Sequence, residues 1–128
     1  MDAEYFNFFS PNKIESTFNV RTKTIAVDFT SGDGIYEKIR NAIAGLEVGI
    51  LVNNVGMAYE YPDFFLEVPN HGKFISDLIS CNISSIPHMC KLVMPQMVER
   101  KKGLIINLSS LSANIPCPML SLYSASKV

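Results

Sequence analysis

A tyrosine and a lysine four residues apart, Tyr123 and Lys127, stand near the end of the 128-residue chain. On a helix, side chains at this spacing share a face, so a phenol and an ammonium group can meet there. A free tyrosine has a pKa of about 10, and a nearby cation favours its phenolate form. Such a pair can donate and accept protons in general acid–base catalysis. The spacing is weak evidence by itself, because five tyrosines make chance matches common.

The segments before this pair alternate between short apolar runs and amphipathic stretches. Apolar runs bounded by turn residues predict three buried strands, at Lys23–Asp28, Val48–Asn53 and Leu104–Leu108. Apolar residues spaced by three and four predict a helix from Ile35 to Leu46, and a longer helix is predicted over Lys73–Arg100. Strands and helices in this order indicate an α/β fold, part of a doubly wound, Rossmann-like parallel sheet.

Particular residues are expected to shape the helices. Asp33 is the expected N-cap of the first helix, and Gly45 is expected to mark its exit. Pro87 lies inside the long helix, five residues after Asn82, where it removes a backbone donor and can cost about 3 kcal/mol. We therefore expect a distorted helix near Asn82.

The remaining segments are predicted to be mostly irregular. Residues 57–72 and 109–122 are expected to be loops, and a last helix is expected to start near Ser121. Residues 1–12 mix aromatic and acidic residues without a clear period, so we expect them to be irregular. The incomplete folded domain is therefore placed at residues 13–128.

Composition argues against several functional classes. The net charge of −1 and the lack of a basic stripe argue against nucleic acid as a partner. No apolar stretch reaches the length of about 18 residues typical of a membrane span, and the start does not resemble a signal peptide. The cysteines and histidines lack metal-ligand spacing, so we expect no metal site, free buried thiols, and a solvated loop position for His71.

Polar residues follow each predicted strand. Asp28 and Phe29 follow the first strand, Asn53-Asn54-Val55-Gly56 the second, and Ser109-Ser110 the third. Ligands of open parallel sheets bind at the carboxyl ends of the strands, and these ends meet at one edge. The sequence therefore predicts a binding site at this edge, where core packing alone does not explain the residue types.

Four of these features occur together in the short-chain dehydrogenase/reductase family. The Asn-Asn-Val-Gly motif at 53–56 resembles the family's Asn-Asn-Ala-Gly. Ser110 stands 13 residues before Tyr123, and Asn82 stands 28 residues before Ser110, which are the family's spacings for its catalytic serine and asparagine. With the Tyr123–Lys127 pair, this order of motifs identifies the chain as a member of the family.

The resemblance is strongest to one group of that family, the 17-beta-hydroxysteroid dehydrogenase type 3/12 group, which includes very-long-chain 3-oxoacyl-CoA reductases. It extends from about Lys13 to the end and is carried by TKTIAVDF, GLEVGILVNNVGM, LVMPQMVERKKG and LYSASK. It implies reduction of a carbonyl on an apolar substrate, a 3-oxoacyl-CoA in fatty-acid elongation or a 17-ketosteroid. It also implies NADP(H) as cofactor, with NAD(H) left open, and a place at the endoplasmic reticulum membrane.

The resemblance assigns catalytic roles residue by residue. It implies that Tyr123 donates a proton to the substrate carbonyl while hydride arrives from the cofactor. It implies that Lys127 favours the phenolate and binds the nicotinamide ribose. Ser110 would hydrogen-bond the same carbonyl oxygen, and Asn82 would hold a water of a proton relay. Taken alone, Ser110 could also be a turn hydroxyl.

Cofactor contacts follow from the same resemblance. Asp28 would accept from the adenine amino group, with Phe29 beside it, while Asn54, Val55 and Gly56 would form the wall near the adenosine ribose. Gly56 suits a close approach of backbone. The residues themselves leave alternatives open, because Asp28 could cap the following turn and Asn54 could tie strands together as a structural amide.

Parts of the family's domain are missing from the sequence. No glycine-rich phosphate-binding motif occurs in it, and the predicted strands correspond to the family's third to fifth. Strand 23–28 then lacks its native neighbours, so we expect a partial domain that is marginally folded and inactive alone. The alternative is a non-catalytic short product that binds a partner. The Lys73–Arg100 helix is a candidate contact in a homo-oligomer.

Overall fold

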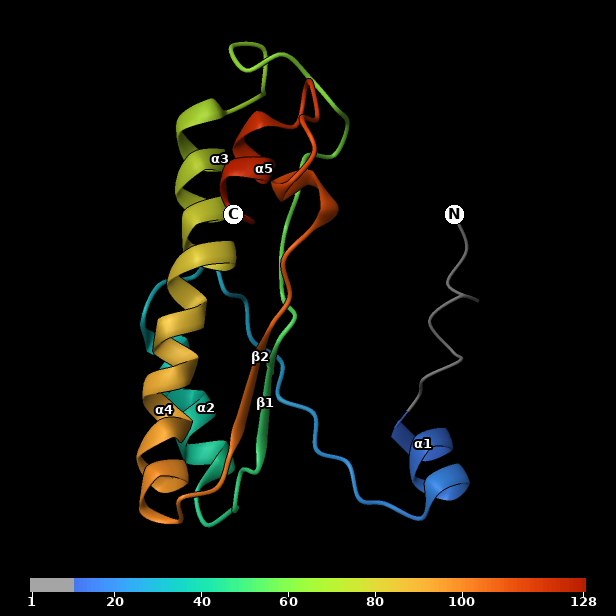
Figure 1. Ribbon diagram of the computed structural model, residues 1–128, viewed down its shortest axis with the longest axis vertical. Coiled ribbons are helices and arrows are strands. Elements are labelled where there is room, and N and C mark those ends of the chain that lie inside the picture. The colour runs from blue at the N-terminus through green and yellow to red at the C-terminus, as the bar shows by residue number, and fades with distance from the viewer. Residues whose placement is uncertain (1–10) are drawn as a thin grey trace.

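The computed structural model describes residues 11–128 (Figure 1). In chain order its elements are α1 (Pro11–Phe18), α2 (Gly34–Ile43), β1 (Ile50–Asn53), α3 (His71–Leu78), the π-helical turn η2 (Ile79–Ser84), α4 (Ser85–Glu99), β2 (Leu104–Asn107), the 3-10 turn η3 (Leu111–Ala113) and α5 (Ser121–Ala125).

The two strands form a small parallel sheet, as predicted for an α/β fold. β1 pairs with β2 in a register that runs from Ile50 opposite Leu104 to Asn53 opposite Asn107. Leu51 points toward α4 and is buried, whereas the neighbouring Ile50 side chain is 61% exposed. Within the described residues, α4 therefore covers one face of the sheet and the other face stays open.

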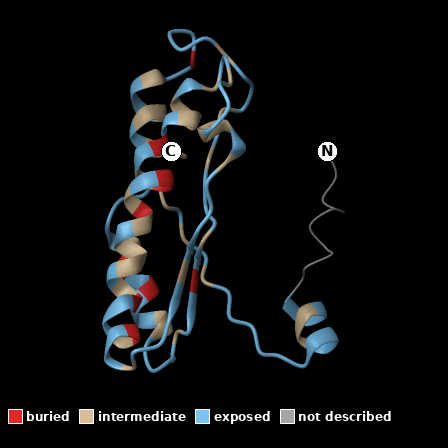
Figure 2. Ribbon diagram, viewed as in Figure 1, coloured by how far each residue is buried: buried red, intermediate tan, exposed pale blue. Residues whose placement is uncertain are grey.

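The core lies between β1 and α4. Leu51, Val93 and Met97 are its buried centre, with further apolar side chains packed around them, namely Ile43, Val48, Met89, Cys90, Leu92 and Ile105. Figure 2 shows most of the buried residues along the α3–α4 rod, while residues 11–33, which lead from α1 to α2, are mainly exposed. This rod is therefore the rigid support on which the strand ends are placed.

The predicted first strand, Lys23–Asp28, does not form, and this prediction is wrong. Strand hydrogen bonds need a neighbouring strand, and β1 and β2 pair with each other instead. Two lysines attach the segment to α2: Lys23 Nζ donates to the Ala42 carbonyl, and Lys38 Nζ donates to the Ala26 carbonyl at 2.7 Å. The segment is thus held by side chains at exposed sites rather than by a ladder.

The helix boundaries differ from prediction at the N-terminal side of the core. α2 ends at Ile43 rather than Leu46, because Gly45 takes a left-handed conformation with φ of 77°. Asp33 stands at the N-cap position, but its side chain makes no capping hydrogen bond. Its Oδ1 atom lies instead 3.9 Å from Nε2 of His88, which stacks on Tyr36 with a ring-centroid distance of 4.3 Å.

β1 also begins later than predicted, at Ile50 rather than Val48. The Val48 amide donates to Gln96 Oε1 at 3.1 Å, and its carbonyl accepts from Arg100 Nη2 at 2.8 Å. Arg100 also donates to Gln96 Oε1 at 2.7 Å and approaches Glu47 at 3.3 Å. Side chains from the end of α4 therefore fix the chain where it enters the sheet.

The predicted irregular segment at residues 1–12 lies outside the described residues except for Pro11 and Asn12. These two begin α1, so the prediction is wrong for them. Proline is favoured in a first helical turn, where its missing N–H would have no helical partner. α1 has no buried residue and lies apart from the core in Figure 1.

The predicted long helix forms, with two differences. It begins at His71, which is half-buried at the start of α3 rather than a solvated loop residue, and its Nε2 atom is buried without a hydrogen-bond partner. A π-helical turn, η2, interrupts it around Asn82. Across residues 11–128, no helix is both long enough and apolar enough to cross a membrane.

Candidate active site

Asn82 lies on the π-helical turn η2, five residues before Pro87. Proline has no amide hydrogen and its ring clashes with the carbonyl four residues earlier, so a helix before it must widen or bend. The Ser85 amide accordingly donates to the Ser80 carbonyl, five residues back. The expected distortion near Asn82 is confirmed, and it takes the form of a π turn, which is frequent at functional sites.

The Asn82 side chain connects two other segments of the chain. Its Oδ1 atom accepts from the Met57 amide at 2.8 Å, and its Nδ2 atom donates to the Met57 carbonyl at 2.9 Å. Nδ2 also donates to Ser126 Oγ at 2.8 Å. With 1% of its surface exposed, Asn82 thus binds the loop after β1 to the segment after α5. Both amide hydrogens are used in these bonds.

Lys127 reaches the same place from the C-terminal segment. Its Nζ atom donates to the Leu108 carbonyl at 3.1 Å, just after β2. A Cβ atom built on Gly56 would lie 3.2 Å from Lys127 Nζ and 3.5 Å from Asn82 Oδ1. Glycine at position 56 therefore leaves the room in which the ammonium group sits, and Ser109 Oγ holds the Lys127 carbonyl by donating to it.

Tyr123 and Lys127 do not share a regular helix, contrary to the spacing argument. α5 ends at Ala125, and the Lys127 amide donates to the Ser124 carbonyl at 3.1 Å. The Tyr123 carbonyl, which a longer helix would offer to Lys127, accepts instead from Ser126 Oγ at 2.7 Å and from the Ser126 amide at 3.0 Å. The turn that follows α5 thus sets the position of Lys127.

The other end of α5 is held by the loop after β1. The Leu122 amide donates to Tyr59 Oη at 3.1 Å, and the Tyr59 ring contacts that of Phe74 with centroids 4.9 Å apart. Tyr123 itself is half-buried. The segment that carries Tyr123 is therefore tied to the loop at both ends, through Tyr59 and through Asn82.

Ser110 lies just after β2 as predicted and caps the 3-10 turn η3. Its Oγ atom accepts from the Ser112 amide at 3.3 Å and from Ser112 Oγ at 2.9 Å. This geometry matches the turn-hydroxyl interpretation. Because Ser110 is the acceptor in both bonds, its own O–H remains a donor that could bind a substrate oxygen.

Part of the predicted cofactor wall comes together in one pocket. Phe29, Asn54 and Val55 line a pocket of about 140 Å³ with Leu51, Val52, Asn53, Ser85 and Met89. A second pocket of about 210 Å³ is lined by Asn82, Lys127 and neighbouring residues, namely Ile86, Asn107, Leu108, Ser109, Ser126 and Val128. The two pockets lie at the ends of β1 and β2, where the sequence predicted a site.

Asp28 is not among the residues that line the pocket containing Phe29. Its carboxylate accepts from the Thr30 amide at 2.9 Å, from Thr30 Oγ1 at 2.7 Å and from Ser31 Oγ at 3.0 Å. The hydrogen bonds from Thr30, foremost that from its backbone, lower the pKa of Asp28 below its ordinary value. This supports the alternative in which Asp28 caps the following turn.

Sequence reasoning missed two polar residues that organise the site. Asn53 Nδ2 donates to Asn107 Oδ1 at 2.8 Å, so the amide that ties the strands together is Asn53 rather than Asn54. Asn53 ends one apolar run and Asn107 is the one polar residue near the end of the other, and this similar position was the available signal. Ser126 links Asn82 to Tyr123, and only its place within Tyr-Ser-Ala-Ser-Lys pointed to it.

The cysteines of the described region are all free, as expected, and differ in burial. Cys81 is buried next to Asn82, whereas Cys90 and Cys117 are half-buried, so the expectation of buried thiols holds fully only for Cys81. Burial raises the pKa of the Cys81 thiol above its ordinary value, as is typical of a structural rather than a reactive cysteine.

A family model described as short chain dehydrogenase matches residues 10–128. The chain belongs to this family. It is 55% identical over 116 residues to the very-long-chain 3-oxoacyl-CoA reductase of Homo sapiens, and 53% identical over 114 residues to very-long-chain 3-oxoacyl-CoA reductase-B of Danio rerio. These matches cover 91% and 89% of the chain, but 37% and 36% of the relatives. The chain thus spans little more than a third of their length.

Solved structures share its fold. A metagenomic short-chain oxidoreductase in complex with NADP superimposes with a TM-score of 0.75 at 25% identity, covering 91% of this chain and 51% of that protein. Together with the parallel sheet and flanking helices, this confirms the partial Rossmann-like α/β fold predicted from the sequence.

Proposed function

We propose that this chain supplies the acid–base part of an NADP(H)-dependent reductase that reduces the 3-oxo group of a long-chain acyl-CoA. The arrangement around Asn82 carries the proposal, because it brings Lys127 and the Tyr123 segment to the carboxyl ends of both strands. The relatives named very-long-chain 3-oxoacyl-CoA reductases support the substrate class.

In this proposal the side chains divide the work of a carbonyl reduction. The cofactor, when bound, supplies the hydride for the carbonyl carbon. Tyr123 donates its phenolic proton to the carbonyl oxygen, and the Ser110 O–H hydrogen-bonds the same oxygen and orients it. Lys127 places a positive charge at the strand edge, and Asn82 keeps that edge fixed to α5.

The residues present fit one side of a dinucleotide. The pocket between Phe29, Asn54 and Met89 is mainly apolar, which suits a flat ring such as adenine. Gly56 allows Lys127 Nζ to lie against the strand edge, which places its positive charge beside this site. The chain holds no glycine-rich phosphate-binding motif, so we assign it only these contacts.

Two further parts of the proposal concern the whole protein. We place it at the endoplasmic reticulum membrane on the basis of the family resemblance alone.

We also propose that copies associate through the rod formed by α3, η2 and α4, which carries a row of exposed apolar side chains, Ile79, Ile83, Met94 and Val98. Sedimentation equilibrium tests this contact: Ile83→Lys should shift the protein to monomer, and an unchanged mass would contradict it.

A chimera tests the proposed activity. This chain would replace the 116 residues that match it in the Homo sapiens relative, and NADPH oxidation would be followed with 3-oxooctadecanoyl-CoA. We expect turnover, and a loss of kcat of about 100-fold or more in Tyr123→Phe. Tyr36→Phe, at a tyrosine of α2 whose ring stacks on His88 away from the acid–base residues, is the control and should keep its kcat.

The alternatives predict different results in the same assay. Turnover of a 17-ketosteroid without turnover of the CoA ester would assign the steroid substrate instead. A chimera that folds and binds NADPH but reduces neither would contradict catalysis and favour a non-catalytic binding partner. The isolated 128-residue chain is expected to show no turnover.

A further inference from the structure

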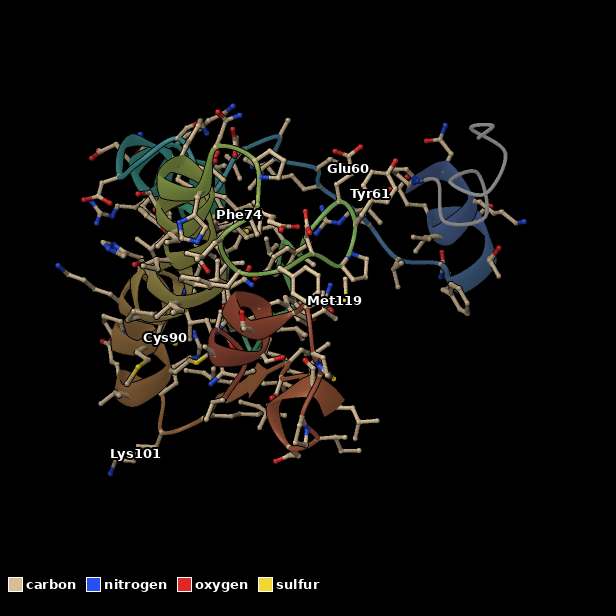
Figure 3. The ribbon with its side chains drawn as sticks, turned by 90° about the horizontal axis from the view of Figure 1, so that it is seen from above. Glu60, Tyr61, Phe74, Cys90, Lys101 and Met119 are labelled. Atoms are coloured by element: carbon tan, nitrogen blue, oxygen red, sulfur yellow. The ribbon has the colours of Figure 1, made fainter. Side chains whose placement is uncertain are left out.

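The loop between β1 and α3 contains a pocket that the acid–base residues do not use. The pocket measures about 300 Å³, within the range of small-molecule sites. Its lining is mainly aromatic and aliphatic, with two carboxylates at the rim, and consists of Tyr59, Glu60, Tyr61, Asp63, Val68, Pro69, Asn70 and Phe74. Figure 3, seen from above, shows Tyr61 and Phe74 around this loop with Met119 beside them.

This pocket is preformed and connected to the segment of Tyr123. Val68 is 7% exposed, and the Tyr59–Phe74 ring contact fixes two of the walls. Tyr59 accepts from the Leu122 amide, one residue before Tyr123. The Asp63 amide donates to the Met119 carbonyl at 3.0 Å, which ties the same loop to the segment between β2 and α5. A ligand in this pocket would therefore lie against the loops that position Tyr123.

The charge of the loop selects the kind of ligand. Residues 57–70 contain three carboxylates, Glu60, Asp63 and Glu67, and no lysine or arginine. Phosphate groups, such as those of coenzyme A, are repelled from such a rim, whereas an uncharged alkyl chain loses only its contact with water on entry. The chemistry of this pocket therefore favours the alkyl tail of an acyl-CoA over its anionic end.

We propose that this pocket binds the alkyl chain of the substrate and orients it tail-first, with the coenzyme A portion directed away from the loop. This inference rests on the proposed function for the identity of the substrate. The alkyl site itself requires neither cofactor nor turnover, so the two can fail separately. Tyr61, 73% exposed at the rim, and Glu60 are then specificity-determining residues.

A titration of the 128-residue chain with octan-1-ol and octanoate, followed by aromatic NMR signals, tests the alkyl site. Octan-1-ol should shift the signals of Tyr59, Tyr61 and Phe74, and affinity should rise about threefold for each methylene from butan-1-ol upward. Octanoate should bind about fivefold or more weakly, because the rim is acidic. Equal binding of the two, or signals unmoved by octan-1-ol, would overturn the proposal.

Variants at the rim make the test specific. Tyr61→Ala should weaken octan-1-ol binding at least about threefold, whereas Leu66→Ala, an 85% exposed residue of the same loop outside the pocket, should not. Glu60→Lys should raise the affinity for octanoate to within about twofold of that for octan-1-ol. Glu67→Lys should raise the octanoate affinity by a smaller factor. Equal effects of the matched variants would contradict a site at this pocket.

The chimera supplies a second, independent measurement. Tyr61→Ala should raise KM for 3-oxooctadecanoyl-CoA more than for 3-oxooctanoyl-CoA and leave kcat unchanged, because uniform binding affects KM alone. A proportional change for both chain lengths would overturn the alkyl site. Alcohol binding without reduction of any CoA ester would overturn the proposed function and leave the alkyl site standing.

Discussion

The segments around Asn82 and around Asp28 each carry a predicted site residue, catalytic for Asn82 and cofactor-binding for Asp28, and they are held by different means. Asn82 is buried and bonded to residues 25 and 44 positions away in sequence. Asp28 is exposed, and the side-chain bonds it makes reach two and three positions. The first arrangement depends on the tertiary fold, whereas the second is a local turn that can exist without it.

The same difference appears in the strands that precede these residues. β1 has a partner strand in register, and its buried Leu51 packs on α4. The segment over 23–28 has no partner strand and no buried side chain packed on a helix. Two exposed hydrogen bonds, each donated by a lysine side chain, attach it to α2. An apolar run thus becomes a strand only where a neighbour supplies hydrogen bonds and a helix covers its face.

The largest effect should come from removing the amide at the centre of the first region. Asn82→Ala deletes three hydrogen bonds and leaves the Met57 amide and carbonyl without that partner. We expect a loss of about 3 kcal/mol in the free energy of unfolding, measured by urea denaturation with circular dichroism. Asn114→Ala, at an exposed site, is the matched control and should change it by less than about 0.5 kcal/mol. Equal changes in the free energy of unfolding for Asn82→Ala and Asn114→Ala would contradict a stabilising role of the Asn82 hydrogen bonds.

A smaller loss in the free energy of unfolding is expected where the Gly56 backbone lies against the Lys127 ammonium group. In Gly56→Ala, the new methyl group would lie 3.2 Å from Lys127 Nζ, so the lysine must shift and weaken its bond to the Leu108 carbonyl. We expect a loss of about 1 kcal/mol and a changed NMR shift of Lys127 Cε. Gly49→Ala meets no atom within 4 Å and is the control. A Lys127 signal that stays in place in Gly56→Ala would contradict the packing described here.

The smallest effect belongs to the Asp28 turn and depends on pH. The hydrogen bonds from Thr30 lower the pKa of Asp28 in the folded protein. The ionised carboxylate therefore stabilises the turn above about pH 4, and this stabilisation is lost as the pH falls through the lowered pKa. Thr30→Val removes the hydroxyl donor and should raise the pKa toward its ordinary value, as followed by the carboxyl carbon in NMR. Thr24→Val, at an exposed site, should leave it unchanged.

Local pattern was sufficient for the elements whose partners lie within the chain. The apolar runs at 48–53 and 104–108 become β1 and β2, and the helical period over 73–100 becomes α3, η2 and α4. The run at 23–28 also has an apolar centre but does not form a strand, since pairing depends on a neighbour that local sequence does not specify. Pro87 indicated distortion, but its form as a π turn depends on backbone geometry that spacing does not reveal.

The candidate site residues stay a prediction from motif spacing, which proposed Asn82, Ser110, Tyr123 and Lys127. Of these four, the structure brings Asn82 and Lys127 to one pocket. It did not find Ser126, because the bond from Asn82 joins residues 44 positions apart. It also placed Tyr123 and Lys127 on one helix, whereas the Ser126 hydroxyl occupies the carbonyl such a helix would need.

Amide hydrogen exchange on the 128-residue chain tests most directly whether Asn82 holds the edge of the sheet and α5 together. The Met57 amide donates to Asn82 Oδ1, and the Ser126 amide donates to the Leu122 and Tyr123 carbonyls in the turn that Asn82 holds through the Ser126 hydroxyl. Both amides should exchange about 100-fold or more slowly than that of Thr30. Asn82→Ala should speed exchange at Met57 directly and at Ser126 through the lost bond to its hydroxyl, without changing Thr30. Exchange of Met57 and Ser126 as fast as Thr30 in the unaltered chain would contradict the account.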